Sequence, residues 1–300
     1  MARSQRGERG GRVAVLWCVL ACGVLLLPLA PAQATDPKSA GAVLAFSRHS
    51  ESVARRSLAS LLETVPPASV RVYEPYEDRV VEFSAWPFAR VLDAVYSKSW
   101  RSEEELLFTC IDGYQPSVPV ARVLSHSAWL AFDRADQPGF TIRKQESGEF
   151  KRVELGPFYL IWENLKDEQM RQEADYGWPY QLVSIDLIRS RDRFPKMTPP
   201  PGAPADVLAG FAAFRVHCSK CHKLNGEGGS IGPELNAAAS PVELRDPQWL
   251  RAWIEEPGRI RPETRMPPLN PALPERARTV DEILAYLRVM ATARSGPEAR

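Results

Sequence analysis

Three side chains near residue 220 have the types and the spacing for covalent haem attachment. They are Cys218, Cys221 and His222: two thiols three positions apart, with a histidine directly behind the second. On one helical turn, residues at i and i+3 share a face, so both sulfurs can add to the two vinyl groups along one porphyrin edge. The imidazole then points at the iron. The pattern predicts one covalent haem c, attached to Cys218 and Cys221 and ligated by His222.

Closely spaced thiols also occur in redox dithiols and in zinc sites. A redox dithiol belongs in a thioredoxin-like setting, and a zinc site needs a second pair of ligands. The chain has five cysteines, and none follows Cys221. His49 and His126 each lack a second ligand at metal-binding spacing. The sequence therefore favours haem over both alternatives.

A candidate for the second axial ligand lies 44 residues after His222, in the segment Met266-Pro267-Pro268. A thioether binds reduced iron well and is not protonated, so the site can change charge with little rearrangement. The alternatives are that Met266 only fills a gap, or that Met197 or Met290 supplies the sulfur. We predict that Met266 is the ligand.

Residues 1–34 have the features of a secretory signal. Four arginines precede an apolar run from 13 to 30, and Ala32-Gln33-Ala34 matches a cleavage site. An uncleaved anchor or a lipid-modified Cys22 are the alternatives. Residues 35–300 carry 34 basic and 36 acidic side chains, without the basic stripe that nucleic-acid binding needs. We expect a periplasmic protein without a nucleic-acid partner, and with membrane association only if the N-terminal segment is retained.

A proline-rich segment divides the rest of the chain. Residues 195–205 contain five prolines, which forbid a helix or a central strand and favour a semi-rigid linker. The flanking residues 35–194 and 206–300 are each numerous enough to form a domain. The sequence thus predicts a signal peptide, a first domain, a linker and a second domain.

Hydrophobic periodicity in residues 35–194 predicts a mixture of helices and strands. Asp112-Gly113 is a turn signal, and Pro179 suggests that the strand after it lies at a sheet edge. Helices are expected at 43–62 and 88–96, and strands at 69–73, 80–83, 106–111, 156–162 and 180–188. This pattern indicates an α+β domain.

The second domain has a regular ladder of residues, at intervals of four, four, three and one: Gly210, Phe214, Cys218, Cys221 and His222. The ladder resembles class I cytochrome c, and the resemblance covers most of residues 206–292. It implies an all-α domain in which the glycine lets the first helix cross the last one closely. Val280, Ile283, Leu284, Leu287 and Ala291 form the apolar face of that last helix.

The same resemblance assigns the glycine-rich stretch 225–233 to the proximal side of the haem. It implies that the Pro233 carbonyl accepts the free imidazole N–H of His222 and so fixes its tautomer. A phosphate-binding loop is the alternative, but neither a preceding strand nor a GK[ST] ending is present. A middle helix is expected at 246–254, with Trp249 and Trp253 either near a haem propionate or in the core.

Residues 108–114 (FTCIDGY) resemble the strand and turn that carry the molybdenum-binding cysteine of sulfite-oxidase-like molybdopterin enzymes. The resemblance implies Cys110 as a metal ligand, and the other interpretation is a small buried side chain. We expect no molybdopterin, because a lone thiolate cannot retain the pterin.

The expected fold class is thus an α+β domain followed by an all-α class I cytochrome c domain. The expected function is electron transfer to redox partner proteins by an exported mono-haem cytochrome that is not an enzyme. The alternatives are the haem-containing subunit of a molybdopterin oxidoreductase that uses Cys110, and a haem sensor with an open axial position.

Overall fold

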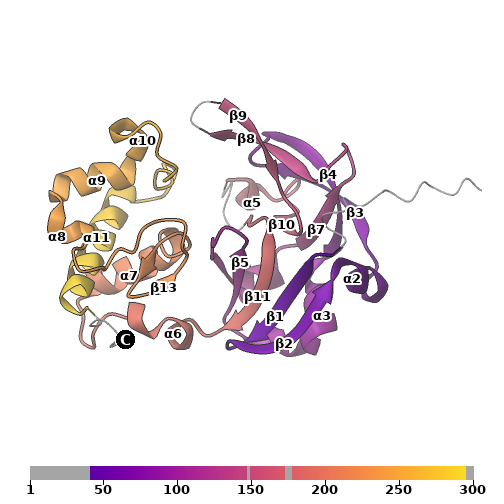
Figure 1. Ribbon diagram of the computed structural model, residues 1–300, viewed down its shortest axis with the longest axis horizontal. Coiled ribbons are helices and arrows are strands. Elements are labelled where there is room, and N and C mark those ends of the chain that lie inside the picture. The colour runs from indigo at the N-terminus through magenta and orange to yellow at the C-terminus, as the bar shows by residue number, and fades with distance from the viewer. Residues whose placement is uncertain (1–40, 147–148, 173–177, 295–300) are drawn as a thin grey trace, which may run out of the picture. The chain divides into compact units, whose positions relative to one another are not determined.

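Five strands form the first sheet of the computed structural model, in the order β2-β1-β11-β5-β6 (Figure 1). Their bounds are Glu51–Ser57, Val43–Arg48, Leu182–Ile188, Glu105–Cys110 and Ser117–Pro119. Strands β1 and β11 are parallel, and the other neighbours are antiparallel. The structure describes residues 41–146, 149–172 and 178–294, so the predictions for residues 1–34 lie outside it.

Four antiparallel strands form the second sheet, in the order β10-β7-β4-β3. Their bounds are Tyr159–Trp162, Ala128–Arg134, Arg79–Pro87 and Ala68–Glu74. Both sheets bury large aromatic side chains in one hydrophobic cluster, including Phe46 of the first sheet and Trp86 and Trp162 of the second. Helices α2 (Leu58–Thr64), α3 (Phe88–Tyr96), α4 (Val120–Ser125) and α5 (Glu168–Gln172) and the 3-10 helix η1 (Ser97–Ser102) connect the strands.

Two hairpins form small sheets of their own. The first joins β8 (Thr141–Glu146) to β9 (Glu149–Glu154). The second joins β12 (Lys223–Leu224) to β13 (Glu227–Gly228). Its turn residues, Asn225 and Gly226, both have positive φ angles, 55° and 84°, as two-residue hairpin turns require.

The helices after residue 189 are α6 to α11, with the 3-10 helix η2 (Pro195–Met197) between the first two. Their bounds are Ser190–Arg193, Ala205–His217, Pro241–Leu244, Pro247–Glu255, Pro257–Ile260 and Arg276–Thr292. The long helices α7 and α11 cross closely at Gly210, where an added Cβ would lie 1.9 Å from the carbonyl oxygen of Glu282. Only a glycine permits this approach.

Most predicted elements are confirmed, but two expectations for the first sheet are wrong. Residues 43–62 are not one helix: β1 and β2 form a hairpin whose turn residues His49 and Ser50 have positive φ angles. His49-Ser50 is not one of the Asn-Gly, Asp-Gly or Gly-Gly pairs that usually mark a two-residue hairpin turn. Strand β11 is central, between β1 and β5. Pro179 precedes Leu182, the first residue of this strand. The N–H group that proline lacks is therefore not needed for the hydrogen bonds of the sheet.

The predicted fold class, with an all-α class I cytochrome c domain at the C-terminus, is also wrong. The chain is a mixed α/β structure with several sheets, and the hairpin β12–β13 lies within the part expected to be helical. In addition, Leu107 of β5 and Ile188 of β11 belong to the same buried cluster as Phe214 of α7. Apolar side chains of α7 and of the first sheet therefore pack in one cluster, because this packing removes their surface from water.

All described residues belong to one compact unit of the chain. That residues 195–205 link two domains, each of which can fold independently, stays a prediction. Phe194, directly before that segment, and Met197 within it are buried, and the Tyr286 hydroxyl donates a 2.6 Å hydrogen bond to the Met197 carbonyl. No helix among the described residues is long and apolar enough to cross a membrane.

Candidate functional site

The residues of the haem-attachment motif form a turn that continues from the end of α7. Cys218 is the C-terminal cap of this helix, and its N–H donates to the Phe214 carbonyl at 2.8 Å. The Cys218 carbonyl then accepts from the N–H groups of Cys221 and His222, at 3.0 and 2.9 Å. The motif thus takes the single-turn arrangement that its spacing predicts.

Both thiols are free and half-buried. Burial raises the pKa of Cys218 to about 12 and also raises the pKa of Cys221. Both sulfurs therefore remain protonated at neutral pH, unlike the thiolates of reactive dithiols. His217, also half-buried, has its pKa lowered to about 4 by burial, so it is neutral at pH 7.

The imidazole of His222 is held through one of its nitrogens. Its Nδ1 lies 2.8 Å from the carbonyl oxygen of Pro233. A carbonyl only accepts hydrogen bonds, so Nδ1 carries a proton, and in the neutral imidazole Nε2 then has the free lone pair. A Cβ on Gly232 would lie 2.4 to 2.8 Å from three atoms of the ring, so a bare backbone packs against the imidazole there.

The glycine-rich stretch folds back onto the motif. The N–H groups of Gly229 and Gly232 donate to the carbonyls of Ser219 and Cys221, both at 2.8 Å. A Cβ on Gly229 would lie 2.0 Å from the Lys220 carbonyl oxygen. Gly228 has a φ of 112°, and its Cβ would lie 2.4 Å from the His222 carbonyl oxygen. Glycine is required at these positions because the backbone lies in close contact with the motif. The sequence predicts this packing only for the stretch 225–233 as a whole.

Met266 is half-buried in an irregular segment between α10 and α11. Its N–H donates to the Thr264 hydroxyl at 3.2 Å, and none of the hydrogen bonds between described residues joins it to the motif. The segment is anchored three residues later, where buried Leu269 donates its N–H to the Ile254 carbonyl at 3.0 Å.

The side chains of the other two methionines in this part of the chain are buried. Met197 has no exposed surface and Met290 is 2% exposed. Both belong to the hydrophobic cluster that also contains Phe214 and Ile283. Of the three methionines, Met266 is therefore the one with a side chain accessible to a large ligand.

Trp249 and Trp253 stack in parallel on α9, with ring centroids 5.4 Å apart and planes inclined by 6°. Trp249 is 37% exposed, and the Arg245 guanidinium lies 5.2 Å from the centroid of its ring. Leu250 supplies the buried contact of this helix instead. Trp249 is therefore not a core residue, whereas Trp253 is half-buried.

Cys110 is 4% exposed at the end of β5, opposite Leu182 of β11. It belongs to the hydrophobic cluster of the two large sheets, and burial raises the pKa of its thiol. His49 pairs with Glu103 and His126 with Asp167, at 2.9 and 2.7 Å. Among the described residues, no three His, Cys, Asp or Glu side chains gather in a group that could hold a metal ion.

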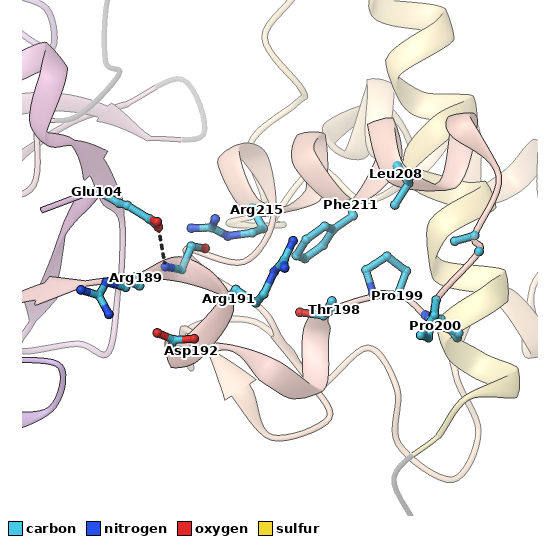
Figure 2. Close-up of a pocket in the computed structure, with 14 residues that line it drawn as sticks. Glu104, Arg189, Arg191, Asp192, Thr198, Pro199, Pro200, Leu208, Phe211 and Arg215 are labelled. Carbon is cyan, nitrogen blue, oxygen red and sulfur yellow. Dashed lines mark hydrogen bonds between the residues drawn. The ribbon is translucent and has the colours of Figure 1, made fainter.

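A cavity of about 810 Å³ lies between α6, α7 and the proline-rich segment. Figure 2 shows Arg191 reaching toward Phe211 of α7, with Thr198 and Pro199 on the neighbouring wall. At one end, the Glu104 carboxylate accepts a 3.3 Å hydrogen bond from the Ser190 N–H. The lining contains none of the predicted site residues, so this cavity is separate from the motif.

No protein-family model matches the chain, and no curated protein matches it. The family resemblances therefore stay predictions, and the functional argument depends on the geometry of the motif.

Proposed function

We propose that the chain is an exported electron-transfer protein that carries one haem c, attached covalently to Cys218 and Cys221. The main support is the hydrogen bond between His222 Nδ1 and the Pro233 carbonyl. In the neutral imidazole this bond places the free lone pair on Nε2, where it can bind a metal. An accepting carbonyl on the far nitrogen also makes the imidazole a stronger donor to a metal.

Two further observations support the fit of the motif to haem. Both thiols are free, three positions apart on one turn, and neither is enclosed completely. The loop behind them approaches through backbone alone at Gly229 and Gly232, which leaves the imidazole ring fixed without a side chain over that face. Thiols and imidazole are thus already placed before a ligand binds, which lowers the ordering cost of binding.

Each residue then has a separate role. When bound, haem supplies one-electron exchange between two oxidation states of iron. His222 and Met266 would hold the iron, and the Pro233 carbonyl accepts the hydrogen bond from Nδ1. A thioether favours the reduced state, so Met266 would raise the potential.

Met266 also bears on the choice between the haem functions considered. With both His222 and Met266 as ligands, the iron would have no open position for a substrate or a diatomic gas. The proposed partners are redox proteins of the periplasm.

The test is denaturing electrophoresis with haem staining, after expression in cells with a c-type haem maturation system. Wild-type protein should stain, and replacing both Cys218 and Cys221 by alanine should abolish the stain. Cys110→Ala is the matched control, a third free cysteine that should leave the stain unchanged. Absence of stain in folded wild-type protein would refute the proposal, and carbon monoxide binding at neutral pH would favour the sensor.

A further inference from the structure

The turn that follows β5 lies directly against the haem-attachment motif. The N–H of Gln115 donates to the Lys220 carbonyl at 2.9 Å, and the Gly113 carbonyl accepts from the Ser230 N–H at 3.0 Å. Lys220 lies inside the motif, between the two cysteines. Ser230 lies in the glycine-rich stretch, three residues before Pro233. One turn, residues 112–115, thus holds both arms of the loop around His222.

This turn is itself fixed to the first sheet. The Cys110 N–H donates to the Tyr114 carbonyl at 2.9 Å, and the Gly113 N–H returns to the Cys110 carbonyl at 3.0 Å. The Asp112 carboxylate accepts from the Tyr114 N–H at 3.0 Å. Ile111 donates to the Gln181 carbonyl at 3.0 Å, next to β11. The turn is therefore a rigid support rather than a free loop.

A second link joins the other end of β5 to the helix that carries the motif. The Arg215 guanidinium makes two hydrogen bonds to the Glu105 carboxylate, at 2.7 and 3.2 Å. Both side chains are less than one-fifth exposed. The carbonyl of Arg215 accepts from the Ser219 hydroxyl at 2.7 Å. Paired arginine–carboxylate bonds of this kind fix orientation as well as distance.

We infer that the turn of residues 112–115 is a positioning element for the axial imidazole, with Gly113 as its critical residue. The inference rests on the proposed haem function. The Pro233 carbonyl controls the proton on Nδ1, and Pro233 is held only three residues from the bond between Ser230 and Gly113. Displacing Ser230 would lengthen the bond between Nδ1 and Pro233 and make the imidazole a weaker donor. A weaker donor stabilises oxidised iron less, so the potential would rise.

Gly113 offers a specific perturbation of this contact. Its φ is 88°, and an added Cβ would lie 2.1 Å from the Ser230 hydroxyl and 3.4 Å from the Ser230 Cβ. Rotation of the hydroxyl could accommodate alanine, whereas the branched side chain of Gly113→Val would have to displace Ser230. Gly202→Val is the matched control, because Gly202 has a φ of 80° and nothing within 4 Å of its Cβ position. Both variants carry the same backbone strain, and only one meets the loop.

The experiment compares wild type, Gly113→Val, Gly202→Val, and Gly113→Val combined with Ser230→Gly. Covalent haem should be retained in all four. Gly113→Val should raise the reduction potential and speed the exchange of the Nδ1 proton with solvent, measured by NMR. Gly202→Val should match wild type, and the double variant should return toward it, because removing the Ser230 side chain makes room for valine.

An unchanged potential and proton exchange in haem-loaded Gly113→Val would overturn the inference and leave the haem function intact. A wild-type protein without covalent haem would instead refute the haem function. If Gly113→Val does not fold, hydrogen exchange at the Ser230 amide is measured in haem-free wild-type protein, where its bond to the Gly113 carbonyl should slow exchange to the rate of the amides of β5. Such protection supports the inference, and exchange as fast as at an unbonded loop amide overturns it.

Discussion

The Tyr159 hydroxyl donates a 2.8 Å hydrogen bond to Oε1 of Glu74, and neither side chain has exposed surface. The other carboxylate oxygen accepts from the Glu77 N–H at 2.7 Å. Burial raises the pKa of Glu74 to about 7, although both hydrogen bonds favour the ionised form. The protein therefore contains an acid, far along the chain from the haem motif, that titrates near neutral pH.

Because the pKa of Glu74 is higher in the folded than in the unfolded chain, its contribution to stability is complete in acid and is lost as pH rises through 7. The shift corresponds to about 3 kcal/mol as an upper limit. We predict that the unfolding free energy of Glu74→Gln falls less between pH 5 and pH 8 than that of wild type. Glu63→Gln, at an exposed position, should retain the wild-type slope. Equal slopes for all three proteins in urea denaturation would contradict the assignment.

Gly210→Ala should weaken the crossing of α7 and α11. The new methyl group would overlap the Glu282 carbonyl and approach the Tyr286 Cβ to 2.9 Å, so the helices must separate. We expect a loss of about 1 to 3 kcal/mol in the unfolding free energy. Gly258→Ala in α10 is the control, since nothing lies within 4 Å of its Cβ position. Stability equal to that control would show that the crossing can relax.

Met266→Ala should abolish the weak sulfur-to-iron absorption band of the ferric protein and lower the potential, because a thioether ligand raises it. Met197→Ala and Met290→Ala should keep the band and lose about 2 to 5 kcal/mol of stability, as buried large-to-small changes do. Optical spectra and potentiometry of the three variants make the comparison. If the band survives in Met266→Ala and disappears in one of the others, the ligand is that buried sulfur.

Cys110→Ser should leave the haem spectrum unchanged and cost about 1 to 3 kcal/mol, because a hydroxyl replaces a thiol in an apolar cluster. The measurement is thermal or chemical unfolding, together with elemental analysis for iron and molybdenum. Stoichiometric molybdenum that is lost in Cys110→Ser would make the protein a molybdopterin oxidoreductase instead.

The sequence alone predicts the features that depend on short-range spacing of residues. Cys218, Cys221 and His222 are recognisable from spacing alone, and the apolar face of α11 is evident from its periodicity. Asn225-Gly226 is also a standard two-residue hairpin signal, and it marks the hairpin β12–β13 that an all-α domain would lack.

Other features have no local signal. The left-handed turn at His49 and Ser50 contains no Gly, Asn or Asp, so periodicity alone predicts a helix where the hairpin β1–β2 forms. The contacts of Gly113 with Ser230 and of Gln115 with Lys220 join residues more than 100 positions apart. Such contacts arise from tertiary packing, which a single sequence does not specify.

The stacked pair of Trp249 and Trp253 has an optical consequence. Two indoles with nearly parallel planes and ring centroids 5.4 Å apart should couple their electronic transitions and give a paired positive and negative signal in the ultraviolet circular dichroism. Neither indole belongs to the buried clusters, so this signal should respond to small changes in α9 before the core melts. The protein therefore carries an intrinsic spectroscopic probe of this helix, which requires no added label.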